Sequence, residues 1–214
     1  MPRVSRAQAD ANHQAIEAAA SRLFRERGLQ GVTVAEIMAD AGLTHGGFYA
    51  HYASKDALAA SACESAFAAS ADLWQHKIAA SAPGESREVI AESYLRSTNC
   101  DPSVASCPTA TLVADVARAG AEHPIHAAYV DGVRQQIETL AALGHSNDPA
   151  RDRADACVRL STMMGALLLA RACHGDPLSA EIASAARAAL TTGRARGRTK
   201  ETRVRRAKTT GGAR

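Results

Sequence analysis

The sequence predicts an all-α fold of about nine helices. Hydrophobic residues make up 46% of the 214 residues, whereas aromatic residues make up only 4%, and this balance favours closely packed helices over sheets. Apolar residues recur at helical spacing along most of the chain, and no segment shows the alternation typical of a strand. The length is sufficient for one large domain or two modest ones, each with a core of its own.

The first expected helix carries a one-sided apolar stripe. Ile16, Ala20, Leu23 and Phe24 follow the i, i+4, i+7, i+8 spacing of a helix that packs on one face. Gly28 follows at the position where a C-cap glycine belongs.

A second, short helix is predicted by its start and stop signals. Thr33 and Glu36 have the T-x-x-E spacing of a capping box, and Gly42 ends the helix after about two turns.

The third expected helix covers residues 44–51, with Thr44 as its N-cap. So short a helix is not stable alone in water, and we expect Leu43, Phe48 and Tyr52 to pack it against the first two helices. A helix, a short helix, a glycine-containing turn and another short helix make up the helix-turn-helix plan.

The rest of the chain is expected to form a larger helical body. Ser54 caps a long helix that we expect to end near residue 82, before the Pro-Gly pair at 83–84. Further helices are expected at residues 85–98, 109–119, 123–143, 151–174 and 178–192. We therefore predict a head over residues 1–54, a body over residues 55–193 and a tail over residues 194–214.

The predicted tail concentrates the positive charge of the chain. It holds nine basic residues and one acidic residue, a net +8, so the +3 of the whole chain leaves −5 for residues 1–193. Its composition gives no apolar periodicity. Two interpretations stay open: a solvated tail, or an arm that holds DNA nonspecifically through its phosphates.

Neither a membrane segment nor a metal site is predicted. The longest apolar run falls far short of the ~20 residues that span a bilayer, and the N-terminus lacks the apolar core of a secretory signal, so we expect a cytoplasmic protein. Five cysteines without a close pair favour reduced thiols. No cysteine and histidine spacing suits zinc, and we expect no metal and no cofactor.

Two segments of the head resemble a known signature. Residues 31–37, GVTVAEI, and 41–58, AGLTHGGFYAHYASKDAL, are similar to the DNA-binding signature of TetR-family transcriptional regulators. The resemblance rests on the order of turn, aromatic pair, imidazole and Ser-Lys-acid-x-Leu. It implies a homodimer that places residues 44–51 of each head in the major groove of a near-palindromic double-stranded DNA operator, with a body that binds a small-molecule effector. The resemblance also favours a repressor over an activator.

Seven residues of the head are the expected DNA contacts: Thr33, Thr44, His45, Gly46, Tyr49, His51 and Lys55. Thr44 and His45 open the third helix, where side chains are best placed to meet base edges. Tyr49 matches the family's aromatic that reaches the DNA backbone.

Four of these seven residues also have a structural interpretation. Thr33 either contacts a phosphate or only caps its helix, and His51 is either structural or a phosphate contact. A lysine at a helix start, such as Lys55, opposes the helix dipole and suggests a phosphate partner. Gly46 and its neighbour Gly47 weaken a helix, which makes sense if DNA or a neighbouring helix approaches closely.

The body offers candidates for dimerisation and for ligand binding. The helix at residues 151–174 is apolar on several faces, and with residues 178–192 it resembles the family's dimerisation helices. Family pockets lie among the middle helices, so the expected ligand contacts, each also a candidate core residue, are Trp74, Tyr94, His126, Tyr129 and Met163.

Two alternative modes of regulation remain at this point. Cys100 and Cys107 lie in one loop before a helix, where a thiol with a lowered pKa could sense oxidants or electrophiles. A partner protein could instead control DNA binding. An enzyme is not expected, because the chain has no catalytic residue set of a known kind, no phosphate loop and no dinucleotide fingerprint.

Overall fold

The computed structural model describes residues 5–102, 104 and 107–191. Within these residues the chain forms nine α-helices and two short 3-10 helices and contains no strand, which confirms the predicted all-α fold. None of the described helices is long and apolar enough to cross a membrane. The predicted tail at residues 194–214 lies outside the described residues.

Three helices form a head at one end of the molecule: α1 (Arg6–Arg27), α2 (Val34–Asp40) and the 3-10 helix η1 (His45–Ala50). Ser5 caps the start of α1 with its side chain, and Gly28 ends α1 with a φ of 75°. That backbone conformation favours glycine, because a Cβ there is strained.

The start of α2 has the predicted capping box. The Thr33 hydroxyl accepts a hydrogen bond from the Glu36 N–H, and the Glu36 carboxylate accepts one from the Thr33 N–H. After α2, Gly42 makes the turn with a φ of 71°. Both signals of this short helix are therefore confirmed.

The third helix of the head is shorter and tighter than expected. The segment predicted over residues 44–51 is a 3-10 helix of six residues, and Thr44 precedes it without a capping hydrogen bond from its side chain. Gly46 and Gly47 weaken an α-helix by about 1 kcal/mol each relative to alanine, and the tighter 3-10 turn suits so short a segment.

The body contains the other eight helices, and its order follows the prediction with two local breaks. The helix expected at 85–98 ends at Tyr94, and that expected at 109–119 divides at Leu112. The bounds are α3 (Lys55–Ala80), α4 (Ser86–Tyr94), η2 (Ser97–Cys100), α5 (Pro108–Thr111), α6 (Val113–Ala119), α7 (Pro124–Ala142), α8 (Pro149–Ala172) and α9 (Pro177–Thr191).

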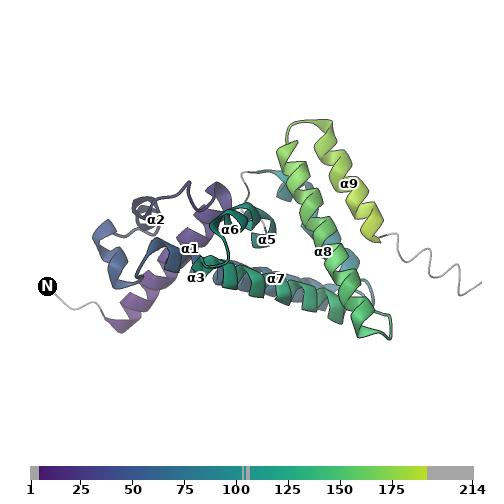
Figure 1. Ribbon diagram of the computed structural model, residues 1–214, viewed down its shortest axis with the longest axis horizontal. Helices are drawn as coiled ribbons and strands as arrows, with labels where there is room; N and C mark the ends of the chain where they lie inside the picture. Colours follow the sequence, from purple (N-terminus) through teal and green to yellow (C-terminus); the bar gives the residue numbers. More distant parts are fainter. Residues whose placement is uncertain (1–4, 103, 105–106, 192–214) are drawn as a thin grey trace, which may run out of the picture.

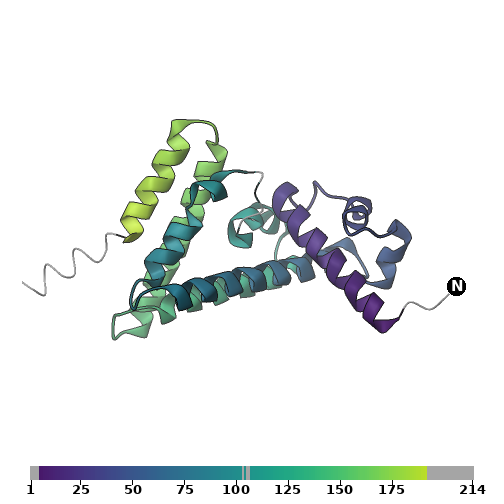
Figure 2. The same ribbon diagram turned by 180° about the vertical axis from the view of Figure 1, so that it is seen from behind.

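The arrangement is elongated, with the head at one end and the α8–α9 hairpin at the other (Figures 1 and 2). The long helix α3 packs along α7 and links the two ends. The short helices α5 and α6 lie between head and hairpin, where α6 packs on α7 and α5 contacts both α1 and α8.

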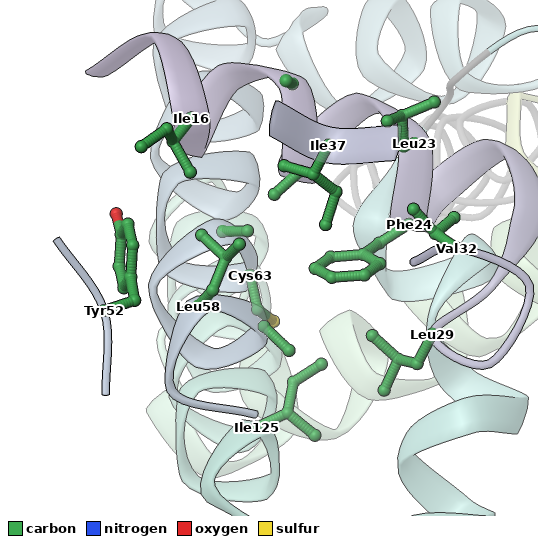
Figure 3. Close-up of a cluster of buried hydrophobic side chains, with 14 of the residues drawn as sticks. Ile16, Leu23, Phe24, Leu29, Val32, Ile37, Tyr52, Leu58, Cys63 and Ile125 are labelled. Carbon is green, nitrogen blue, oxygen red and sulfur yellow. The ribbon is translucent and has the colours of Figure 1, made fainter. Parts of the chain in front are cut away.

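Two apolar cores support this arrangement, and the first joins head to body. Ile16, Phe24 and Ile37 of the head pack with Leu58 of α3 and Ile125 of α7 in one buried cluster (Figure 3). The second core lies among α3, α4, α7, α8 and α9. Since the first core continues across residue 54, α3 is the element through which the body positions the head.

Candidate nucleic-acid interface

The 3-10 helix η1 presents one face to the core and the other to solvent. Phe48 is completely buried, whereas the neighbouring Tyr49 is 71% exposed. Tyr52 is buried against the same cluster, and Leu43 is partly buried beside it. The predicted anchoring by Leu43, Phe48 and Tyr52 is therefore confirmed, and it fixes which side of η1 faces outward.

Tyr52 is held by a residue that the sequence interpretation missed. Its ring stacks on the His13 ring at a centroid distance of 4.7 Å, and its hydroxyl lies 3.0 Å from His13 Nε2. The half-buried His51 ring lies 6.1 Å from the same imidazole. Because His13 belongs to α1, this contact joins η1 to the first helix of the head.

The outward face of η1 carries four of the predicted DNA contacts together. Thr44, His45, Gly46 and Tyr49 are all exposed, and the Thr44 hydroxyl is not used for capping. A polar, exposed edge anchored on a buried aromatic is the arrangement that a recognition helix needs to enter a groove.

The two glycines of η1 are not required by packing within the subunit. A Cβ at Gly46 would meet no atom within 4 Å, and one at Gly47 would meet only the Met38 methyl at 3.7 Å. Neither residue has a positive φ. Of the two explanations left open by the sequence, close approach to a neighbouring helix is therefore the weaker one.

Thr33 and Lys55 both have intramolecular partners that the sequence did not reveal in full. The Thr33 N–H and hydroxyl both donate to the Glu36 carboxylate at 2.8 Å. The Lys55 ammonium donates to the Leu29 carbonyl oxygen at 2.6 Å and lies 6.0 Å from the Phe24 ring centroid. The cation at this unfavourable helix position thus has a partner inside the protein.

The charge of Glu36 is stabilised by two neighbours. A hydrogen bond from Arg27, together with those from Thr33, lowers the pKa of Glu36 to about 2. Arg27 also donates to the Gly31 carbonyl. The end of α1, the turn and the start of α2 are therefore joined by one polar network.

Comparison with known proteins agrees with this geometry. Residues 16–62 match the family described as bacterial regulatory proteins, tetR family, and these residues hold α2, η1, most of α1 and the start of α3.

Residues 16–62 belong to the tetR family of bacterial regulatory proteins.

A curated relative matches a short part of the chain. The HTH-type transcriptional regulator YerO of Bacillus subtilis (strain 168) is 46% identical over 43 residues, which are 20% of this chain and 15% of YerO. The matched segment thus spans about a seventh of that relative.

Solved structures resemble the whole described fold. E. coli NemR in its reduced form has a TM-score of 0.66 at 21% identity, covering 82% of this chain and 94% of NemR. A TetR transcriptional regulator from Chloroflexus aurantiacus J-10-FL has a TM-score of 0.69 at 21% identity, covering 86% and 96%. A TetR-family regulator from Cytophaga hutchinsonii has 0.68 at 16%, covering 87% and 95%. At these identities the likeness establishes the fold alone.

The predicted ligand residues do not all line one cavity. Trp74 and Tyr94 line one cavity of about 250 Å³ between α3, α4 and α5. Met163 is buried in the second core, and the Tyr129 hydroxyl donates to the Thr109 carbonyl at 2.6 Å. His126 is half-buried and, like these two, does not line this cavity.

The two candidate redox thiols differ in their surroundings. Cys100 is buried, and burial raises the pKa of its thiol. Cys107 is half-buried, lines the same cavity as Trp74 and accepts a hydrogen bond from the Gln136 amide at 3.4 Å. The part of the chain that the structure describes holds no group of three residues placed to bind a metal ion.

Proposed function

We propose that the chain is a ligand-responsive transcriptional repressor that binds a near-palindromic operator as a homodimer and is released by a small molecule. The observation that carries the proposal is the exposed edge of η1, anchored by the buried Phe48 and Tyr52. Thr44 and His45 meet base edges in the major groove, Tyr49 meets the DNA backbone, and Gly46 allows close approach.

The other predicted DNA contacts have a supporting role. Thr33 and Lys55 lie at two helix starts, where their intramolecular bonds hold the backbone of the head in shape. His51 lies behind η1, beside His13. In this arrangement the contact of Tyr49 with the DNA backbone positions the head, and Thr44 and His45 read the base sequence.

Dimerisation through the α8–α9 hairpin is supported by an apolar stripe. Val158 and Leu169 are 64% and 58% exposed, and they lie on one face of α8 because eleven residues make about three turns. Thr162 and Gly165 lie between them on the same face, and a Cβ at Gly165 would meet nothing within 4 Å in the subunit. A second copy of the chain covers this face and sets the spacing of the two heads.

Release follows from the connection between cavity and head. The cavity wall is formed largely by α3, and the first turn of the same helix packs in the head core through Leu58. A ligand that shifts α3 changes the separation of the two heads until they no longer fit successive major grooves. The existence of the cavity favours a small effector over control by a partner protein.

The test of the proposal is binding to DNA from upstream of the chain's own coding region. Fluorescence anisotropy with that duplex is expected to show salt-sensitive, saturable binding that Thr44→Ala weakens strongly. Tyr49→Phe removes only an exposed hydroxyl, so it is expected to weaken binding without changing thermal stability. Equal affinity for an unrelated duplex of the same length would contradict the proposal.

A thiol-sensing mode is the second candidate, because Cys107 lies in the same cavity. The unmutated protein is then expected to release operator DNA on peroxide treatment, and Cys107→Ser is expected to stay bound. Cys100→Ser serves as the matched control, because the Cys100 thiol is buried and its pKa is raised. Equal release by all three proteins excludes this role for Cys107.

A further inference from the structure

The head itself contributes a residue to the body cavity. Arg25 of α1 lines the cavity together with Ser70, Trp74, Tyr94, Asn99 and Cys107. Its side chain is half-buried, and its Nε donates to the Ser21 carbonyl at 2.8 Å within α1. This burial lowers the pKa of Arg25, because the charged form is partly removed from water.

The lining has a strongly one-sided charge. Arg25 is the single charged residue among the described residues that line the cavity, and no carboxylate lines it. Arg171 lies near the same end, where it donates to the Asn99 carbonyl at 2.8 Å and interacts electrostatically with Tyr94. The cavity therefore favours an anion and disfavours a cation.

A buried hydroxyl in the lining is also left unsatisfied. Tyr94 is only 5% exposed, and its hydroxyl makes no hydrogen bond of normal geometry within the described residues. Burial, followed by the nearby Cys107 thiol, raises the pKa of Tyr94 well above its usual value, so the group remains a neutral donor. An orphaned buried hydroxyl costs stability, and a ligand that pairs with it recovers that cost.

The polar groups beside Tyr94, in contrast, are already paired with one another. The Gln136 amide of α7 donates to Ser70 and Cys107 and accepts from the Thr109 hydroxyl. This network pairs Ser70 and Cys107 of the lining, whereas the Tyr94 hydroxyl has no hydrogen-bond partner within the described residues.

Size and shape limit the ligand further. The cavity volume of about 250 Å³ lies just below the usual range of about 300–1,000 Å³ for ligand pockets. Trp74 and Tyr94 offer ring faces, and Ala66 and Ala69 leave room beside them along α3. One or two fused rings match this space.

We propose that the cavity binds a small aromatic carboxylate whose anionic group pairs with Arg25 and Tyr94. A guanidinium and a carboxylate match in geometry and form charge-assisted hydrogen bonds. The inference rests on the proposed ligand-responsive function and assigns the chemical class of the effector.

The position of Arg25 also gives the ligand a direct route to the head. Arg25 lies one turn before Gly28, and the next residue, Leu29, is held by Asp115 of α6 and by Lys55 of α3. A ligand at Arg25 therefore acts on the end of α1 itself, in addition to any movement of α3.

The experiment uses the only tryptophan of the chain, Trp74, as a fluorescent probe at the cavity. The full-length protein is titrated with benzoate, salicylate and 2-naphthoate, with the neutral isostere benzamide and with the cation benzylamine. At least one carboxylate is expected to change the fluorescence saturably with a Kd below about 1 mM. Benzamide is expected to bind at least about tenfold more weakly than benzoate, and benzylamine not to bind.

Variants of Arg25 and Tyr94 test whether these two residues bind the carboxylate. Arg25→Gln is expected to abolish the preference for benzoate over benzamide, and Arg25→Lys to keep part of it. Arg22→Gln is the matched control, because Arg22 lies on the same helix, pairs with Glu26 and Asp40 and does not line the cavity. Tyr94→Phe removes an unpaired hydroxyl, so it is expected to weaken carboxylate binding without lowering the melting temperature.

The proposal is overturned if none of the three carboxylates binds, if benzamide binds as well as benzoate, or if Arg25→Gln and Arg25→Lys both keep the full preference. Operator binding is measured separately on the unliganded protein. If that binding fails, the proposed function is wrong whatever the titration shows. If the unliganded protein binds the operator but no carboxylate binds, only the proposed ligand class is wrong.

Discussion

At the scale of single residues, the glycines of this chain have different physical roles. Gly46 is in η1 with open space around it, whereas Gly132 of α7 is buried against Phe67 of α3. A Cβ at Gly132 would lie 2.2 Å from the Phe67 ring. One glycine is thus required by the fold, and the other is free to serve recognition.

The pair Gly132→Ala and Gly46→Ala separates these roles. Gly132→Ala is expected to destabilise the protein by about 1–3 kcal/mol, because the ring or the helix must move. Gly46→Ala is expected to leave stability unchanged or raise it by up to about 1 kcal/mol, and to weaken operator binding at least about tenfold. Thermal denaturation and fluorescence anisotropy measure the two effects. Unchanged operator affinity of Gly46→Ala would show that close approach to DNA is not its role.

Glu36 makes a second residue-scale prediction, on pH. Its pKa falls from an ordinary 4.5 to about 2 in the folded protein, so its contribution to stability is full above pH 4.5 and is lost as the pH falls toward 2. Glu36→Gln is expected to lower the melting temperature at pH 7 and to lower it less at pH 3. Because the pair with Arg27 is exposed, added salt is expected to shrink the effect. Equal differences at both pH values would contradict this account.

At the scale of elements, α6 is joined to the head by a polar contact. The Leu29 N–H donates to the Asp115 carboxylate at 3.2 Å, and the Asp115 side chain is largely buried. Asp115 also lies against Gly28, where a Cβ would meet its Oδ2 at 2.9 Å. The turn between α1 and α2 is therefore held to α6 by this side chain, in addition to its contact with Lys55 of α3.

Removal of this carboxylate is expected to loosen the head. Asp115→Ala leaves the Leu29 N–H unsatisfied, which costs about 1–3 kcal/mol, and amide exchange at Leu29 is expected to become faster. Arg118→Ala is the matched control, because it removes only the exposed partner of Asp115, a pair worth about 0–1 kcal/mol. Unchanged exchange at Leu29 in Asp115→Ala would show that the contact does not hold the turn.

At the scale of the whole molecule, the head and the α8–α9 hairpin lie at opposite ends, joined by α3 and α7 (Figure 1). In the proposed dimer the hairpin fixes the distance between two heads, so a small movement of α3 is expected to change the spacing of the heads. The elongated shape makes that spacing sensitive to the direction of α3.

The exposed stripe on α8 gives a prediction about assembly. Val158→Glu places a charge in the proposed dimer interface and is expected to produce monomers that bind the operator weakly. Sedimentation velocity and anisotropy measure the two effects. Glu181→Gln is the control, because this exposed residue of α9 lies off the stripe. A Val158→Glu protein that remains a dimer would place the interface elsewhere.

Local patterns were enough to predict most of the head. The capping box of Thr33 and Glu36 and the turn at Gly42 depend on residues close in sequence, whereas the outward direction of Tyr49 was implied by the family resemblance. Such signals act over three or four residues, so they can be read without a tertiary structure. The position of η1 was predicted, but its 3-10 geometry was not. For so short a helix the free energies of the 3-10 and α forms are similar.

The long-range contacts could not be predicted in this way. Lys55 has its partner at Leu29, and Asp115 holds the same residue from 86 positions away. Of the five expected ligand residues, the cavity unites Trp74 and Tyr94 and adds Arg25 from the head.

The sequence by itself therefore determined the all-α class, the helix order and the cap and turn signals of the head, because these follow from periodicity and local caps. Only the tertiary structure decided which side chains meet in the cavity and how the body holds the head. Those contacts join residues of different helices, and their distances depend on how α1, α3 and α7 pack together.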